Sequence, residues 1–185
     1  MSKLFLDCGS NLGQGYEFFS SIYGSDCTYH LFEPNIKCYN ILVEKYSNKP
    51  NIQIYNNAVY NSVGTLNFRT ASDFDVGGSL IEEHNSNYLK DEYFNIPVSC
   101  INLIDHINEH YDLGNKIYLK LDIESSEYDV LESMIESGTI HKVSKIYCEF
   151  HSQYMDAVNQ EVYLQREKNI INYVIENNIN FELWH

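Results

Sequence analysis

The sequence predicts an α/β fold with a mainly parallel, doubly wound sheet. Short apolar runs alternate with stretches whose apolar residues recur every three or four positions, the pattern of strands alternating with helices. A glycine-rich turn follows the first apolar run, where such a fold places its ligand-binding loop. With 185 residues, 44% of them hydrophobic, the chain can form one domain over 1–185 with a substantial core.

Strands and helices alternate regularly in the first part of the chain. The expected elements are a strand at 3–7, a helix at 14–23, a strand at 28–35, a helix at 35–47, a strand at 51–60 and an antiparallel strand at 64–70. The second helix is indicated by Ile36, Tyr39 and Leu42, which recur at three-residue steps and therefore share one face. Right-handed crossovers would place the strands in a single sheet.

A polar segment divides the two halves of the chain. Residues 71–95 include Gly77-Gly78 and are too long for a plain connection, so we expect a substrate or lid loop there. The elements expected after it are a short strand running into a helix at 96–111, a buried strand at 116–124, a helix at 127–137, a strand at 143–151, a helix at 160–177 and a last strand at 180–185.

Composition and charge exclude several classes of function. The formal net charge is −14, from 12 basic and 26 acidic residues, which disfavours nucleic acids and anionic membranes as partners. The chain has no run of 18 apolar residues and no secretory signal pattern, so we expect a cytoplasmic protein without a membrane span. Its five cysteines include no CxxC pair, which argues against a disulfide framework or a thiolate zinc site.

The turn at residues 7–15, DCGSNLGQG, restricts the choice of ligand. It lacks the glycine-lysine-serine/threonine of a nucleoside triphosphate loop and the GxGxxG of a dinucleotide loop. Its GxxxGxG spacing is shared by short-chain dehydrogenases that bind NAD. Those enzymes use a tyrosine followed four residues later by lysine, and none of the 16 tyrosines here has a lysine at that offset. An NAD-dependent oxidoreductase therefore remains only as an alternative.

Two acidic residues favour S-adenosylmethionine. Asp7, at the end of the first strand, would repel a pyrophosphate but can hold the ammonium group of a methionine moiety. Glu33 ends the second strand, where a carboxylate can accept both hydroxyls of a ribose. The pair indicates an adenosine-containing ligand, and Asp7 favours the methionine-linked one.

Several stretches along the chain together resemble one known family. FLDCGSNLGQ is similar to a D-x-G-x-N-x-G turn, FEPN closes the second strand, and NNAVYNSVGTLNF is like an asparagine/alanine-valine stretch followed by a short strand. VSCINLIDHI resembles a V-x-x-x-x-L-D segment, LKLDIESSEYDVL is close to L-K-I-D-V-E-G-x-E-x-x-V-L, and YCEFH looks like a fifth strand. These motifs, in this order, are those of the FkbM family of S-adenosylmethionine-dependent methyltransferases.

The resemblance implies a Rossmann-like class I methyltransferase fold, and methyl transfer to a hydroxyl of a sugar, glycan or small metabolite. It also implies a set of cofactor-binding residues: Asp7, Gly9, Ser10, Asn11 and Gly13 around the methionine end, Glu33 at the ribose, and Asn57 with Ala58 beside the adenine. The 71–95 loop would close over the acceptor.

Two departures from the family pattern leave a non-catalytic alternative open. Ser125 stands where the family has a glycine, so the turn there is expected to differ. One strand follows the last long helix, so we expect the sheet to lack the seventh strand of the common methyltransferase sheet. A second subunit could cover the exposed edge. Otherwise the chain would be a relic that binds adenosine ligands without catalysis.

Four groups after two of the strands are candidates for catalysis. On alternate positions, Asp122 and Glu124 share one face of their strand, and Glu149 and His151 share one face of theirs. If the strands are neighbours, the four groups converge beside the transferred methyl. His151 could then act as a base, or the group could hold a divalent cation such as Mg²⁺ that acidifies the acceptor hydroxyl.

The alternative for these residues is an ion-pair network with Lys120 that only supports the structure. Glu127 is interpreted as a helix stabiliser. His106 and His110 are four residues apart on a predicted helix, a spacing that can bind zinc. No third ligand is evident, so a solvated helix face is favoured, and His30 and His84 receive no role.

Overall fold

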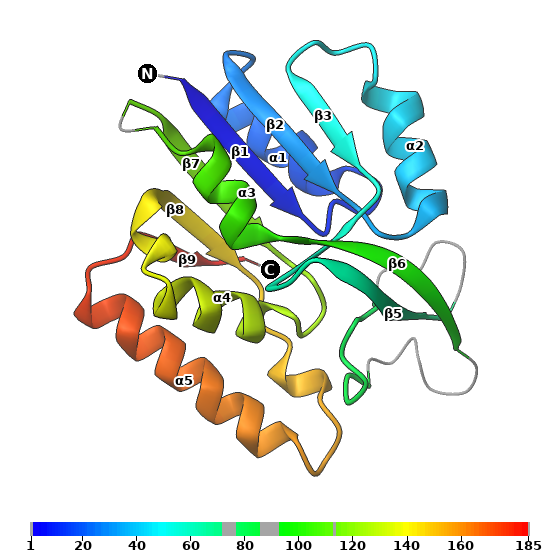
Figure 1. Cartoon of the computed structure of the whole chain (residues 1–185), viewed down its shortest axis with the longest axis vertical. Helices are drawn as coiled ribbons and strands as arrows, with labels where there is room; N and C mark the ends of the chain where they lie inside the picture. Colours follow the sequence, from blue (N-terminus) through cyan, green and yellow to red (C-terminus); the bar gives the residue numbers. More distant parts are fainter. Residues whose placement is uncertain (1, 72–76, 86–92, 113, 185) are drawn as a thin grey trace.

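The computed structural model describes residues 2–71, 77–85, 93–112 and 114–184 and confirms the α/β fold. Its main sheet has six strands in the order β3-β2-β1-β7-β8-β9, and a smaller sheet has the order β4-β6-β5 (Figure 1). The main strands are β1 (Lys3–Cys8), β2 (Cys27–Phe32), β3 (Ile52–Tyr55), β7 (Lys116–Leu121), β8 (Val143–Cys148) and β9 (Phe181–Leu183). The small sheet contains β4 (Ala58–Tyr60), β5 (Gly64–Thr70) and β6 (Phe94–Asn102).

Every strand pair of the main sheet is parallel, as a Rossmann-like fold requires. The chain moves outward from β1 through β2 to β3, then returns to β7 on the other side of β1. The carboxyl ends of β1 and β7 therefore lie at the switch point of the sheet, where such folds bind ligands. No antiparallel seventh strand joins this sheet within the described part of the chain.

Five α-helices cover the two faces of the main sheet. They are α1 (Gln14–Tyr23), α2 (Ile36–Tyr46), α3 (Leu103–His110), α4 (Glu127–Glu136) and α5 (Gln160–Glu176). The larger core lies between the sheet and α3, α4 and α5, which stand in front of the sheet in Figure 1. The second core lies against α1 and α2 and is mostly aromatic, with Phe5, Phe19 and Tyr29 fully buried. Burial on both faces explains the apolar runs of the strands.

The expected strand at 51–60 is split, which corrects the prediction of one continuous element. Ile52–Tyr55 pairs with β2, whereas Ala58–Tyr60 pairs with β6 of the small sheet. The amide of Asn56 donates to the carbonyls of Glu33 (2.9 Å) and Pro34 (3.0 Å), so the chain leaves the main sheet at this point. The expectation of a single sheet is therefore wrong for β4, β5 and β6.

The other expected elements are confirmed with small shifts at their ends. Residues 64–70 pair antiparallel with β6, as expected. β6 begins at Phe94, so the last residues of the predicted 71–95 loop belong to a strand. β7 ends at Leu121 and β8 at Cys148, several residues before the predicted ends. In the described residues we find no helix with the length and apolar character that crossing a membrane requires.

We expect Leu119→Ala to lower the free energy of unfolding by about 2–5 kcal/mol, because its side chain is fully buried in β7 between two covered faces. The matched control is Leu183→Ala in β9, whose side chain is half exposed and should change stability by less than about 1 kcal/mol. Urea unfolding measures both values. An equal loss of unfolding free energy in the two variants would contradict the burial of β7 at the centre of the sheet.

Candidate active site

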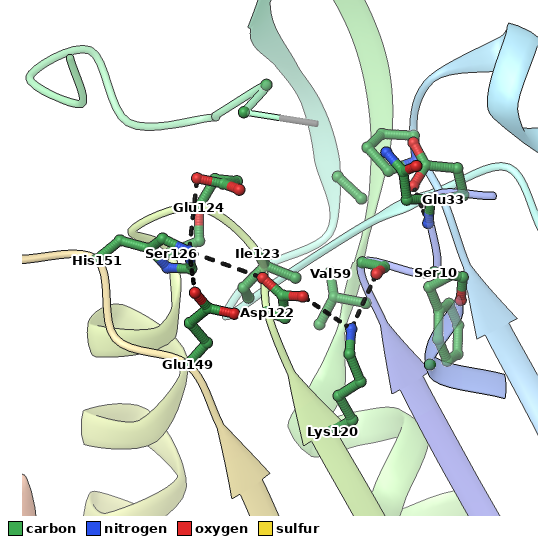
Figure 2. Close-up of a pocket in the computed structure, with 18 of the residues that line it drawn as sticks. Ser10, Glu33, Val59, Lys120, Asp122, Ile123, Glu124, Ser126, Glu149 and His151 are labelled. Atoms are coloured by element: carbon green, nitrogen blue, oxygen red, sulfur yellow. Dashed lines mark hydrogen bonds and ion pairs between the residues drawn. The ribbon is translucent and has the colours of Figure 1, made fainter. Parts of the chain in front are cut away.

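A cavity of about 360 Å³ lies at the carboxyl ends of β1 and β7. This volume is in the range of small-molecule sites. Most residues predicted from the sequence line it: Gly9, Ser10, Asn11, Glu33, Ala58, Asp122, Glu124, Glu149 and His151. Figure 2 shows the acidic group around His151 at one end and Glu33 at the other. The structure thus brings the two predicted groups into one space.

The glycine turn after β1 is shaped by close contact with the loop after β7. Gly9 has a φ of +80°, and a Cβ there would lie 1.8 Å from the carbonyl oxygen of Asp122, so no other residue fits. The turn leads into α1, whose first residues Gln14 and Gly15 line the cavity. The N-terminus of a helix attracts negative groups such as a carboxylate.

Glu33 is held with free acceptor capacity toward the cavity. Its Oε2 accepts from the backbone N–H of Asn11 (2.9 Å) and its Oε1 from that of Asn35 (2.8 Å). Each carboxylate oxygen can accept a second hydrogen bond, so the group can still bind two vicinal hydroxyls. Burial raises the pKa of Glu33 to about 7, although the bonds from Asn35 and Asn11 oppose the shift.

Lys120 is a buried cation that links two strands. Its Nζ lies 3.2 Å from Asp7 and 3.2 Å from Asp122, and it donates to the carbonyl of Gly9 at 3.0 Å. Asp7 and Lys120 are register partners on β1 and β7. Burial by itself lowers the pKa of Lys120, but the charges of Asp122 and Asp7 outweigh it and raise the pKa. Lys120 therefore carries its charge at any working pH.

Three predicted cofactor residues, all described in the structure, stand outside the cavity wall. Asp7 is fully buried beneath it, where it faces Lys120. Gly13, with a φ of +99°, is the N-cap of α1 beside Tyr46. Asn57 donates to the carbonyl of Ser99. Direct contact of these residues with a ligand stays a prediction. In the structure they contact residues around the cavity and do not line it.

His151 is the centre of the acidic group. Its Nε2 lies 3.7 Å from Asp122, 3.6 Å from Glu124 and 3.9 Å from Glu149. β7 and β8 are neighbours in the sheet, which confirms the prediction that the strands before these residues lie side by side. The prediction that these residues share strand faces is wrong, however, because all four lie in loops beyond the last residues of β7 and β8. The turns after the strands, and not the pleat, bring them together.

The electrostatics of the group argue against His151 as the base. Burial lowers its pKa, but the charge and hydrogen bond of Glu127, with the charges of Glu124 and Asp122, outweigh this and raise the pKa to about 10. His151 is therefore an imidazolium near neutral pH. The pKa of Glu149 is raised by burial and by the charge of Asp122, which makes its carboxylate a stronger base than an ordinary glutamate.

Sequence reasoning missed the position of Glu127. It is fully buried, and its Oε1 lies 3.0 Å from Nδ1 of His151 while accepting from the N–H of Ile123 at 2.6 Å. Glu127 thus fixes the orientation of the imidazole and leaves Nε2 toward the cavity. The third acid of LDIESSE was the available signal, and its interpretation as a helix stabiliser overlooked this tertiary contact.

His84, given no role from the sequence, is also fully buried beside the group. Its Nδ1 lies 2.8 Å from Oγ of Ser125, and its Nε2 lies 3.3 Å from Glu124. Ser125 has a φ of +79°, a conformation that favours glycine. The turn therefore adopts a backbone conformation that is usual for glycine, although the residue is a serine. The expectation that its shape differs from the family's stays a prediction. No local motif around His84 indicated this contact.

The described part of the 71–95 segment contributes to the cavity wall. Gly77, Gly78 and Leu80 line the cavity, and Ser79 donates to the carbonyl of Glu124. Residues 72–76 and 86–92 lie outside the described residues. The role of the whole segment in closing over an acceptor stays a prediction.

Comparison with known proteins identifies one family. A family model described as a methyltransferase FkbM domain matches residues 7–176, which is most of the chain. The comparisons with curated proteins and with solved structures gave no match.

We expect Lys120→Met to lower the free energy of unfolding by about 3–5 kcal/mol, because it leaves Asp7 and Asp122 without their shared cation. The matched control is Lys3→Met, which removes an exposed pair with Asp26 and should leave stability nearly unchanged. Urea unfolding at neutral pH measures both. A Lys120→Met protein as stable as the wild type would contradict the proposed importance of this cation.

Proposed function

The chain belongs to the methyltransferase FkbM family, and on this basis we propose that it transfers a methyl group from S-adenosylmethionine to a hydroxyl oxygen of a sugar, glycan or small metabolite. The observation that carries the proposal is one cavity with the buried carboxylate of Glu33 at one end and the carboxylates of Asp122, Glu124 and Glu149 at the other. A donor bound along this cavity would present its methyl group to the acidic end.

We propose one direction for the donor along the cavity. Glu33 would accept the two ribose hydroxyls through its remaining lone pairs. Phe32, Pro34 and Val59 provide an apolar wall for the adenine next to Glu33. The N-terminus of α1 would receive the methionine carboxylate. The positive sulfonium would then lie toward the carboxylates of Asp122 and Glu149, which favour a cation.

The chemistry requires alignment and removal of one proton. Bound S-adenosylmethionine would supply an activated methyl group, which the acceptor oxygen would attack in line as the carbon–sulfur bond breaks and its electron pair stays on the sulfur of the product S-adenosylhomocysteine. We assign acceptance of the hydroxyl proton to Glu149, whose pKa is raised by burial. His151, as an imidazolium held by Glu127, would balance the negative charges and keep the carboxylates close together.

The charge of the cavity supports an uncharged acceptor rich in hydroxyls. Asp122, Glu124 and Glu149 would accept hydrogen bonds from hydroxyl groups, and they would repel phosphorylated or carboxylated molecules. A net charge of −14 adds to this repulsion. Sugars and other polyols satisfy these conditions, whereas nucleic acids do not.

A divalent cation is the alternative means of acidifying the hydroxyl. Two carboxylate oxygens, from Asp122 and Glu149, and a ring nitrogen of His151 lie within 4.8 Å of one another. The imidazolium of His151 would have to lose a proton to become the third ligand, so binding of the cation would release that proton. A cation such as Mg²⁺ bound there would act as a Lewis acid on the acceptor oxygen. Activity that survives a chelator supports proton acceptance by Glu149 alone, and activity lost to a chelator and restored by Mg²⁺ supports the cation.

We expect Glu149→Gln to lower kcat about a hundredfold or more, because the hydroxyl loses its proton acceptor, while binding of S-adenosylhomocysteine stays nearly unchanged. The matched control is Glu161→Gln, an exposed position on α5, which should change neither value. Methyl transfer to a panel of sugars and polyols is measured by release of S-adenosylhomocysteine. Cofactor binding without any acceptor turnover in the wild type would favour the non-catalytic alternative, and binding of NAD⁺ alone would favour an oxidoreductase.

Binding of S-adenosylhomocysteine should tighten as the pH rises from about 6 to about 8. Glu33 has a pKa raised to about 7 by burial, so below this pH it is protonated and accepts the ribose hydroxyls poorly. The dissociation constant should fall up to about tenfold per pH unit below the pKa and then level off. Calorimetric titration of the wild type and of Glu33→Gln tests this, since the variant should bind weakly at every pH. An equally steep dependence in Glu33→Gln would contradict the assignment.

A further inference from the structure

Three histidines from separate parts of the sequence meet outside the cavity. His30 lies on β2, and His106 and His110 lie one turn apart on α3. Nδ1 of His30 is 2.9 Å from Nε2 of His106, and the ring centres of His106 and His110 are 4.4 Å apart. One ring nitrogen from each residue lies within 4.8 Å of the others. The sequence offered no third ligand beside His106 and His110, and His30 supplies it in the structure.

The orientation of the rings suits metal binding. Nδ1 of His110 lies 2.8 Å from the carbonyl oxygen of His106, so it donates there and leaves Nε2 with a free lone pair. A hydrogen bond of this kind on the outer nitrogen is usual for histidines that bind metals. Four ligands at about 2.0–2.1 Å around Zn²⁺ stand about 3.3 Å apart, so the 2.9 Å between His30 and His106 needs only a small opening.

We propose that His30, His106 and His110 bind one Zn²⁺ ion, with water in the fourth position. Three imidazoles without a carboxylate favour Zn²⁺ over Mg²⁺ or Ca²⁺, which prefer oxygen ligands. His30 is buried, whereas His106 and His110 are half-buried and give the ion access from solvent. The negative charge of Glu109 acts on His106 and adds to the attraction for a cation.

The hydrogen bond between His30 and His106 also limits how their rings could bind the ion. One proton must lie between Nδ1 of His30 and Nε2 of His106 for this hydrogen bond to form. Zn²⁺ would bind the lone pair of each neutral ring, so the ring that donates in this hydrogen bond would carry its proton on its other nitrogen when the ion is bound.

The ion would link α3 to β2 beneath the cavity. The ring of His106 meets the ring of Phe32 edge-on at 5.2 Å, and Phe32 lines the cavity. The three histidines themselves do not line the cavity. The zinc site is therefore separate from the acidic group around His151, and its test does not depend on methyl transfer.

The experiment is a titration of the untagged, metal-free full chain with Zn²⁺ by calorimetry, and with Co²⁺ by visible absorption. We expect one Zn²⁺ per chain, a tetrahedral Co²⁺ spectrum and a rise in melting temperature with Zn²⁺. His106→Ala and His110→Ala should each weaken binding more than about tenfold. His110→Gln serves as a second variant at this half-buried position if the alanine disturbs folding, which circular dichroism reports.

Two controls separate this site from other sources of affinity. His141→Ala removes an exposed histidine outside the cluster and should bind Zn²⁺ like the wild type. Asp122→Asn changes the acidic group in the cavity and should also retain the zinc. Failure of the wild type to bind, unchanged binding in the His106 and His110 variants, or loss of binding in Asp122→Asn would each overturn the proposal. These outcomes leave the proposed methyl transfer untouched.

Discussion

The buried ion-pair system of Lys120 with Asp7 and Asp122 is the constraint on which the site depends. Lys120 stands beside Asp7 in the register of β1 and β7 and reaches Asp122 just beyond the end of β7. A buried charge is tolerated only when it is paired. These ion pairs therefore hold the carboxyl ends of β1 and β7 at a fixed distance from each other. The turn at Gly9 packs directly against the carbonyl of Asp122 as a result, and the cavity opens above this contact.

The acidic end of the cavity is organised by a second buried contact. Glu127, at the start of α4, holds both Nδ1 of His151 and the backbone of Ile123. It thereby ties the loop after β7 to the loop after β8, and it raises the pKa of His151 against the effect of burial. A cationic His151 lets three carboxylates face one small space. Without it their mutual repulsion would oppose this close arrangement.

Ser125, which stands where the family pattern has a glycine, adopts a left-handed backbone conformation. A glycine would adopt the φ of +79° without strain, whereas serine does so at a cost. Its hydroxyl contacts the buried ring of His84, which also lies close to Glu124. The segment after β5 is thus attached to the loop after β7 by a contact that a glycine cannot make. The serine is compatible with an intact site.

Local patterns in the sequence determined the helices and most strands, because periodicity and caps act within a few residues. The predicted bounds of α1 are those observed, and Glu33 stands at the end of β2 as expected. Only the tertiary structure decided the split at Asn56, the burial of Asp7, the orientation of His151 by Glu127 and the meeting of His30 with α3. Each of these depends on contacts between residues distant in sequence, and on burial that sets which charges are paired. No short-range pattern encodes such contacts, so they became visible only when the sheet order placed the strand ends side by side.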